Sequence, residues 1–215
     1  MRRLKIIDRI LDTLRASDTV AIGGHMRPDG DCIGSQLALA YALKDAGKKV
    51  TVYNQDPMPD KLAFLDPDRI LRGPSRAGAF DTAVVTDCAS AERLGTISEN
   101  LDRRNCLINI DHHASNTRYG DLNWVDARSA SSGELVYRLL QHARWPITPL
   151  IADCLFTAIS TDTGSFQYPT TQPSTYLAAA ELVKRGANLG RICNEVYQSY
   201  PLSRVKLLRH MYNSF

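Results

Sequence analysis

Short apolar segments alternate with longer, helix-like segments over the first half of the chain. Continuous apolar runs at 19–24, 48–54, 82–87 and 106–111 predict buried strands. The segment 31–47 predicts a helix that ends at Gly47, and 90–101 predicts a shorter helix. Because buried strands that alternate with helices are typical of parallel sheets, we expect an α/β fold: a doubly wound, mainly parallel sheet with helices on both faces.

The two ends of the chain show helical patterns. Residues 1–17 predict an amphipathic helix with Leu4, Ile7, Leu11 and Leu14 on one face. From about Ser131 the pattern changes to helix after helix. A helical C-terminal part is therefore expected after the sheet, with helices at 131–143, 149–160, 174–186, 189–200 and 203–215, and a short helix is expected earlier at 61–65.

Composition narrows the class of protein. The 44% hydrophobic and 23% charged residues are ordinary for a soluble globular protein, and a net charge of +3 permits an anionic substrate without requiring one. No apolar run approaches the ~20 residues of a membrane span, and the N-terminal segment does not resemble a secretory signal. Five widely spaced cysteines indicate reduced thiols. We expect a cytoplasmic protein that does not enter a membrane.

Metal-capable side chains follow three of the predicted strands. In open α/β sheets ligands collect at the carboxyl ends of the strands, so these side chains are expected at one edge. One further aspartate ends an apolar helix, from which it could point into the same cleft. The set is His25, Asp29 and Asp31 after the first strand, Asp87 after the third, Asp111, His112 and His113 after the fourth, and Asp162 on the helix.

Aspartate and histidine without cysteine favour hard or borderline divalent ions. Mn²⁺ suits a carboxylate-rich set best, Mg²⁺ is possible, and Zn²⁺ is chemically allowed. Two such ions, about 3.5–4 Å apart, can activate water and hold the oxygens of a phosphate, which is a standard arrangement for phosphoester hydrolysis. Asp87, alone at the end of its strand and central in the order, is the candidate for the ligand that both ions share.

Each residue also has a purely structural interpretation. Asp29 and Asp31 lie in a turn-like PDGD sequence, and Asp162 could simply end its helix. These interpretations would all have to hold together, at the ends of four elements, so we favour the metal site.

Neighbouring residues leave other choices open. Arg27 could meet either a phosphate or solvent, and Ser131 and Ser132 either cap a helix or face a phosphate. Neighbours at a strand end diverge, so His112 and His113 are not expected to bind the same ion.

Four ordered motifs, GHMRPDGDCIGS, VVTDCAS, NIDHHASN and STDTGSF, resemble those of the DHH phosphoesterase superfamily, over about residues 18–170. The first motif is most similar to that of the bacterial nanoRNases, which are oligoribonucleases and 3′-phosphoadenosine 5′-phosphate phosphatases. It is less similar to family II pyrophosphatases and to RecJ-type exonucleases. A departure is Cys32, where the family pattern implies a small residue such as alanine.

The resemblance implies roles for the site residues. One manganese ion would be held by His25, Asp29 and Asp87. A second would be held by Asp31, Asp87, His112 and Asp162, with Asp87 bridging. Asp111 would orient His112, while His113 would face substrate. Arg27 is kept as a candidate substrate contact from its position between His25 and Asp29, not from the resemblance. The implied partners are short single-stranded RNA or a small phosphorylated nucleotide, and a second copy of the chain in a homodimer.

Family members carry a C-terminal substrate-binding domain with a glycine-rich, histidine-containing loop, and no segment here matches it. We expect residues 1–187 to form the catalytic domain and 188–215 to begin a helical linker to that missing domain. The chain would then be either the catalytic part of a longer protein or a natural fragment. The alternative functions are hydrolysis of linear dinucleotides derived from cyclic second messengers, hydrolysis of pyrophosphate, and a metal-binding module without catalysis.

Overall fold

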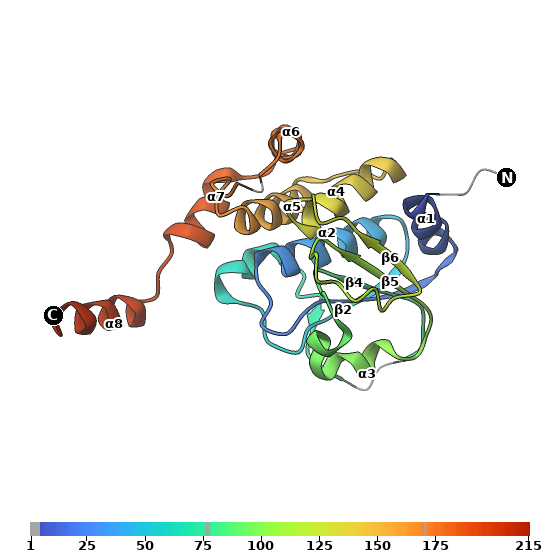
Figure 1. Cartoon of the computed structure of the whole chain (residues 1–215), viewed down its shortest axis with the longest axis horizontal. Coiled ribbons are helices and arrows are strands. Elements are labelled where there is room, and N and C mark those ends of the chain that lie inside the picture. The colour runs from blue at the N-terminus through green and yellow to red at the C-terminus, as the bar shows by residue number, and fades with distance from the viewer. Residues whose placement is uncertain (1–4, 76–77, 170) are drawn as a thin grey trace.

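A six-stranded sheet forms the centre of the computed structural model, which describes residues 5–75, 78–169 and 171–215 (Figure 1). Its order is β3-β2-β1-β4-β5-β6, and every neighbouring pair is parallel. This confirms the expected parallel α/β fold. The strands are β1 (Thr19–Gly23), β2 (Lys49–Tyr53), β3 (Leu71–Arg72), β4 (Phe80–Thr86), β5 (Arg104–Asp111) and β6 (Leu122–Val125).

The sequence pattern did not predict the two edge strands. β3 has 2 residues, too few for a recognisable pattern. β6 has 4 residues that alternate between buried and half-buried positions, and so it lacks the continuous apolar run of the central strands. Both extend a sheet whose four inner strands had been predicted.

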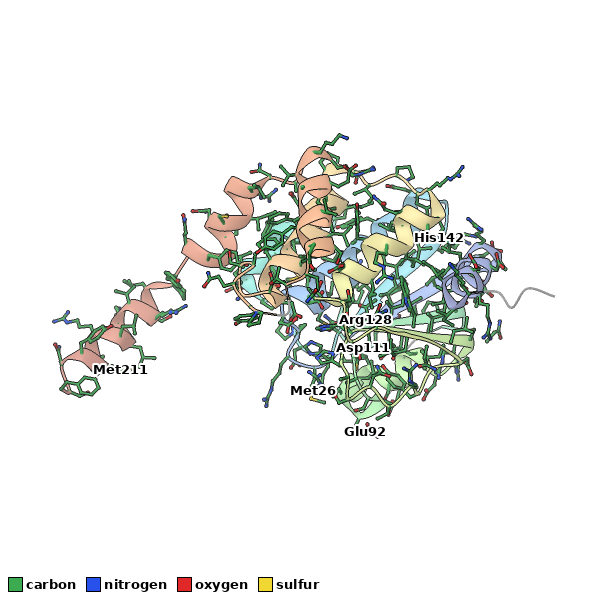
Figure 2. The ribbon with its side chains drawn as sticks, turned by 45° about the horizontal axis from the view of Figure 1, so that its top comes forward. Met26, Glu92, Asp111, Arg128, His142 and Met211 are labelled. Carbon is green, nitrogen blue, oxygen red and sulfur yellow. The ribbon has the colours of Figure 1, made fainter. Side chains whose placement is uncertain are left out.

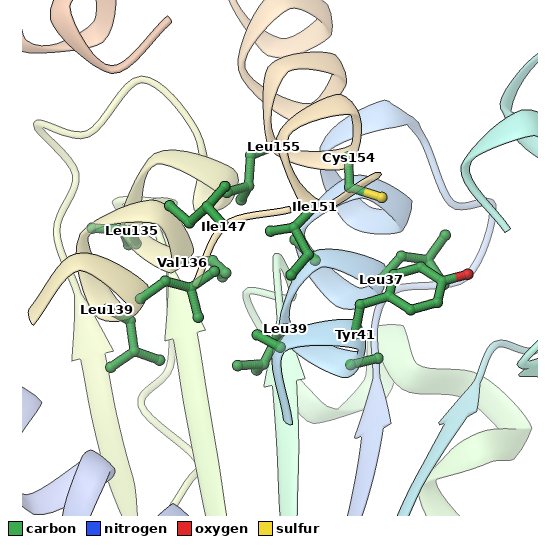
Figure 3. Close-up of a cluster of buried hydrophobic side chains, with 14 of the residues drawn as sticks. Leu37, Leu39, Tyr41, Leu135, Val136, Leu139, Ile147, Ile151, Cys154 and Leu155 are labelled. Atoms are coloured by element: carbon green, nitrogen blue, oxygen red, sulfur yellow. The ribbon is translucent and has the colours of Figure 1, made fainter. Parts of the chain in front are cut away.

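Helices cover both faces of the sheet (Figure 1). On one face lie α2 (Gly30–Asp45), α4 (Ser132–Ala143) and α5 (Pro149–Asp162), and α1 (Ile6–Ala16) contacts β6 and α4. Their apolar side chains form the larger core, part of which Figure 3 shows around Leu37, Val136 and Ile151. The other face packs against the 3₁₀ segment η2 (Ala91–Ile97) and α3 (Ser98–Leu101).

Close packing of α2 against α5 matters for the functional edge. A Cβ atom at Gly34 would overlap the carbonyl oxygen of Cys154 and lie 2.9 Å from Cβ of Ala158. The missing side chain therefore lets the two helices approach closely. As a result, the C-terminal end of α5, where Asp162 lies, reaches the first turn of α2.

The predicted N-terminal helix and the predicted short helix both form. In α1, Leu11 and Leu14 are buried as expected, Ile10 joins them, and Ile7 is half-buried. Leu4 lies outside the described residues. The segment expected at 61–65 forms a 3₁₀ helix, η1 (Asp60–Leu65). Gly47 follows α2 with a positive φ of 83°, as its predicted position after the helix requires.

The C-terminal part is helical, as predicted: α6 (Pro173–Lys184), α7 (Leu189–Cys193), the π-helical turn η3 (Asn194–Gln198) and α8 (Leu202–Tyr212). Ile192 and Val196 still belong to the core, so packing onto the body continues beyond residue 187. By contrast, α8 buries no residue, and Figure 2 shows its Met211 far from Asp111 in the body. Over the described ranges, no helix is long and apolar enough to cross a membrane.

Candidate metal centre

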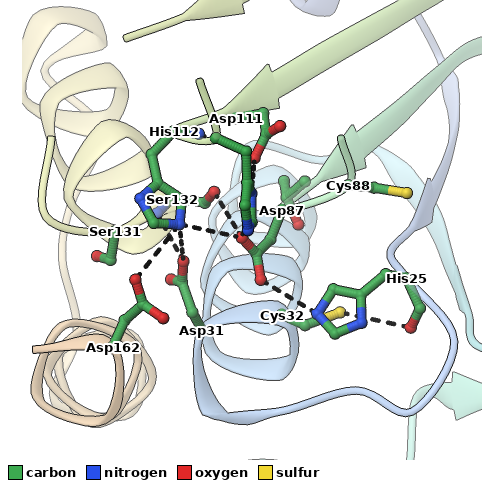
Figure 4. A network of polar contacts seen from close by, with 12 residues as sticks. His25, Asp31, Cys32, Asp87, Cys88, Asp111, His112, Ser131, Ser132 and Asp162 are labelled. Carbon is green, nitrogen blue, oxygen red and sulfur yellow. Dashed lines mark hydrogen bonds and ion pairs between the residues drawn. The ribbon is translucent and has the colours of Figure 1, made fainter. Parts of the chain in front are cut away.

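The predicted ligands converge at the carboxyl edge of the sheet (Figure 4). β1 and β4 are neighbours there, but the chain continues from them to opposite sides of the sheet, and such a switch point opens a crevice. The end of α5 adds Asp162 from the helical layer. Figure 4 shows side chains from the β1–α2 region, β4, β5, α4 and α5 directed toward one another.

Asp87 lies at the middle of the centre and is only 2% exposed. It directly follows β4 with a φ of 57°, a left-handed conformation that aspartate tolerates better than most residues. Its backbone N–H donates to the carbonyl of Ile110. Its Oδ2 lies 3.3 Å from Nε2 of His25, and its Oδ1 lies 3.5 Å from Nε2 of His112. The two carboxylate oxygens thus face different imidazoles.

His25 and Asp29 form one side of the centre. Nδ1 of His25 is bonded to the carbonyl of Met26 at 2.8 Å, which leaves Nε2 toward the carboxylates. Asp29 caps α2, because its Oδ1 accepts from the backbone N–H groups of Asp31 and Cys32. Oδ1 also lies 3.8 Å from Nε2 of His25, although 60% of the Asp29 side chain is exposed. Asp29 therefore lies at the rim of the centre.

His112 forms the other side. Its Nε2 lies 3.3 Å from Oδ2 of Asp162, 3.5 Å from Oδ1 of Asp87 and 3.8 Å from Oδ2 of Asp31. This nitrogen is buried and has no hydrogen-bond partner among the described residues. A buried, unpaired nitrogen that faces three carboxylates is costly unless a cation lies among them. The residues therefore fit a divalent ion.

Asp31 connects two helices and is 1% exposed. Its carboxylate accepts from the backbone N–H groups of Ser132 and Gly133 at 2.7 and 2.8 Å. A Cβ atom at Gly133 would lie 3.2 Å from Oδ1 of Asp31 and would overlap Ala158, so the SSG sequence permits this approach. Ser131 caps α4 through Glu134 N–H, as expected. The N–H groups of Ser132 and Gly133 already donate to Asp31. They therefore do not support the alternative in which the start of α4 binds phosphate.

Several carboxylates lie close together in the centre, and their mutual repulsion shifts their pKa values. Burial, followed by the charges of Asp87 and Asp162, holds the pKa of Asp31 well above its usual value. Burial raises the pKa of Asp162 to about 6, with the charges of Asp87 and Asp29 acting in the same direction and that of His112 against them. Burial alone would lower the pKa of His25, but its interactions with Asp29 and Asp87 outweigh burial and raise it. Bound cations would relieve this repulsion.

Asp111 differs in detail from its expected role. It is fully buried, and its Oδ1 accepts from the backbone N–H of His112 but pairs with the ring of His113, 2.8 Å from Nδ1. Oδ2 accepts from Nδ2 of Asn116 at 2.6 Å. Asp111 therefore orients the ring of His113, and holds His112 only by its backbone.

The expectation that the two histidines diverge is wrong. Their ring centroids are 4.5 Å apart, because β5 ends at Asp111 and the strand alternation does not extend to His112 and His113. Asp87, His112 and His113 each offer a ligand atom, and these atoms lie within 4.8 Å of one another.

Sequence reasoning missed some contributors to the centre. Ser132 donates from Oγ to Oδ1 of Asp87 at 3.1 Å, and Asn116 fixes Asp111. Cys32, noted in the sequence only as a departure from the family pattern, offers Sγ beside His25 and Asp87. Only the departure from the family pattern at Cys32 gave a signal. Arg27, a predicted substrate contact, is exposed, and its backbone N–H donates to Asp56.

Known proteins are similar in sequence to this chain over most of its length. A probable bifunctional oligoribonuclease and PAP phosphatase NrnA of Streptococcus mutans is 31% identical over 95% of the chain and 64% of its own length. The bifunctional oligoribonuclease and PAP phosphatase NrnA of Thermus thermophilus is 33% identical over 96% of the chain and 61% of its own length. The chain thus spans less than two thirds of these relatives.

A solved structure and a family model agree with these relatives. The crystal structure of an exopolyphosphatase-related protein from Bacteroides fragilis matches with a TM-score of 0.90 at 26% identity, over 97% of this chain and 64% of that one. The model of the DHH family, N-terminal domain, matches residues 19–159, which include the first three motifs with Asp87 and His112 and end just before the fourth, STDTGSF. This match covers more than half of the chain, which therefore belongs to the DHH family.

Proposed function

We propose that the chain carries the catalytic centre of a two-metal phosphoesterase that hydrolyses short oligoribonucleotides, 3′-phosphoadenosine 5′-phosphate, or both. The observation that carries this proposal is the position of Asp87. Its Oδ2 faces His25 at 3.3 Å and its Oδ1 faces His112 at 3.5 Å, as a carboxylate shared by two ions must. The names of the relatives supply the substrate class.

The side chains divide into two sets of ligands. His25, Asp29 and Asp87 would hold one ion, and Asp31, Asp87, His112 and Asp162 would hold the other. Imidazole and carboxylate together suit Mn²⁺, with Mg²⁺ as the alternative. When bound, the two ions neutralise phosphate oxygens and lower the pKa of water.

His113 and Arg27 are proposed to meet the substrate. The hydrogen bond to Asp111 is the main cause that raises the pKa of His113, so the ring stays protonated at a higher pH than usual. Nδ1 is held by Asp111, which leaves Nε2 to donate a proton to the leaving oxygen of the ester. The His113 side chain is 35% exposed, so a substrate can reach it. Arg27 would pair with a phosphate of the substrate.

Substrate selection needs more than this centre. We propose that residues 188–215 lead toward a substrate-binding domain, because the curated relatives are longer than the chain. The homodimer stays a prediction, which sedimentation velocity can check. The cytoplasmic location also stays a prediction.

The test is turnover by the metal-free protein after addition of Mn²⁺ or Mg²⁺. Four substrates separate the alternatives: a short oligoribonucleotide, 3′-phosphoadenosine 5′-phosphate, a linear dinucleotide and pyrophosphate. We expect Mn²⁺-dependent release of mononucleotide from the first, of phosphate from the second, or both, and loss of turnover with a chelator. Cleavage of pyrophosphate or of the linear dinucleotide alone would overturn the proposed substrates. No cleavage of any of the four by the full-length protein would favour a non-catalytic module.

A further inference from the structure

A sulfur atom borders one side of the metal centre. Figure 4 shows Cys32 of α2 beside His25 and below Asp87. One ligand atom of each of these three residues lies within 4.8 Å of the other two. Their exposed fractions are 0% for Cys32, 4% for His25 and 2% for Asp87, so this is a buried donor set and not a surface cluster.

The surroundings hold the sulfur in place. Nε2 of Gln36, one turn further along α2, donates to Sγ at 3.1 Å. Gln36 is fully buried, and its Oε1 has no hydrogen-bond partner among the described residues. A Cβ atom at Gly24 would overlap both Sγ and the Gln36 amide, so the glycine before His25 makes room for this contact. An N–H that donates to sulfur stabilises the thiolate, which is the form of cysteine that binds metal ions.

Cys32 is more deeply buried on this side of the centre than Asp29 is. Asp29 is 60% exposed in its side chain, and its Oδ1 already accepts two backbone N–H groups that hold the start of α2. Cys32 is fully buried and faces the same side of Asp87. The opposite side has no sulfur in its donor set: Asp31, His112 and Asp162 offer two carboxylates and one imidazole.

We propose that Cys32 is a metal ligand, and that it makes the two sides of the centre select different ions. Cys32 adds a sulfur ligand to the set of His25, Asp29 and Asp87, and this side then takes an ion of the zinc class in place of the manganese named above, because sulfur and imidazole are ligands that zinc prefers. The side formed by Asp31, His112 and Asp162 takes an ion of the manganese class. On binding, Sγ loses its proton to solvent and forms the bond to the ion, with no change of oxidation state. This inference rests on the two-ion site of the proposed function.

Cobalt reports sulfur ligation optically, since a thiolate bound to Co²⁺ gives a charge-transfer absorption in the near ultraviolet. Co²⁺ is titrated into the full chain, and the parent protein for this titration has alanine in place of the accessible Cys106 and Cys193. We expect the parent to develop the band, Cys32→Ser to lose it, and Cys88→Ser to keep it. Cys88 is the matched control, because it follows a ligand directly but belongs to none of the donor sets found among the described residues.

Affinity gives a second measurement. We expect Cys32→Ser to weaken Zn²⁺ binding at least about tenfold, while Mn²⁺ binding changes less. If the variant does not fold, X-ray absorption of the zinc-loaded parent needs no substitution at Cys32. A sulfur atom in the first coordination shell supports the proposal. A shell of nitrogen and oxygen alone overturns it, as does a cobalt band that survives in Cys32→Ser or is absent from the saturated parent.

These readouts are independent of turnover. If the chain shows the Cys32-dependent band but the full-length protein hydrolyses none of the four substrates, the proposed function is overturned and the ligand assignment stands. A chain that hydrolyses them with Mn²⁺ but shows no such band would overturn only the assignment of Cys32.

Discussion

Strand β4 has an aspartate near each end, and the two have different surroundings. Asp81, at the amino end, accepts through Oδ2 from the backbone N–H groups of Asp18 and Thr19 and from the Thr19 hydroxyl, at 2.9, 2.9 and 3.0 Å. Asp87, just beyond the carboxyl end, faces two imidazole nitrogens at 3.3 and 3.5 Å.

The difference lies in what each carboxylate needs. The bonds from the backbone N–H groups of Thr19 and Asp18 hold the pKa of Asp81 below its usual value, and they join the starts of β1 and β4. Asp87 lies instead among buried carboxylates and unpaired nitrogen, an arrangement that is complete only with cations. The same residue type thus has a structural role at one end of the strand and a proposed chemical role at the other.

The largest expected effect comes from Asp87→Asn. An amide cannot replace a carboxylate shared by two ions, so we expect hydrolysis to fall by about 10³-fold or more, the equivalent of several kcal/mol of transition-state stabilisation. The fold should persist, because the substitution conserves shape. Steady-state turnover and circular dichroism check both expectations. Near-normal turnover in Asp87→Asn would end the two-ion assignment.

The next effect comes from Asp111→Asn, which acts on His113 and not on an ion. Loss of the charge should reduce turnover about 10- to 100-fold, in the range seen for residues that orient ligands. It should also lower the pKa of His113 toward its usual value, because the Asp111 hydrogen bond is the largest cause of its elevation. Activity that depends on a protonated His113 should then decline at a lower pH than in the unsubstituted protein.

A pH–rate profile distinguishes this from a merely structural role. If the alkaline limb of the Asp111→Asn profile stays where it is in the unsubstituted protein, His113 is not the proton donor.

The convergence of metal-capable side chains at the carboxyl end of β4 was predictable from the sequence. Asp87 and Asp111 follow continuous apolar strands, and in a parallel sheet the ends of such strands must meet at one edge. The bonds from Ser132 to Asp87 and from Gly133 to Asp31 were not predictable, because they join residues 45 and 102 positions apart through the packing of α4. Likewise, β3 and β6 form by pairing at the sheet edges, which their short sequences do not signal on their own.

Metal removal should change the pH dependence of stability through the carboxylates at the carboxyl edge of the sheet, and not through Asp81. The pKa of Asp162 is raised to about 6 from 3.8, so between these values the folded protein binds more protons than the unfolded one. The metal-free protein should therefore lose stability as the pH rises from about 4 to 6. Excess Mn²⁺ should offset this loss, by about 2.7 kcal/mol at a concentration 100 times its dissociation constant.

Thermal unfolding with chelator and with Mn²⁺, over this pH range, measures the metal effect. A stabilisation by Mn²⁺ that is equally large at pH 4 and pH 6 would contradict the involvement of Asp162, since protons should compete with the ion at the lower pH.

The smallest effect is expected at the other end of the strand. Asp81→Asn removes a charge that the N–H groups of Asp18 and Thr19 stabilise, so the unfolding midpoint should fall while turnover stays unchanged. The lowered pKa of Asp81 means that its contribution is complete above its unfolded value of 3.8 and is lost as the pH falls through the folded value. The difference in midpoint between the unsubstituted protein and Asp81→Asn should therefore shrink below about pH 3.8. A loss of turnover in Asp81→Asn without a change in midpoint would show that the two ends of β4 are not separate in function.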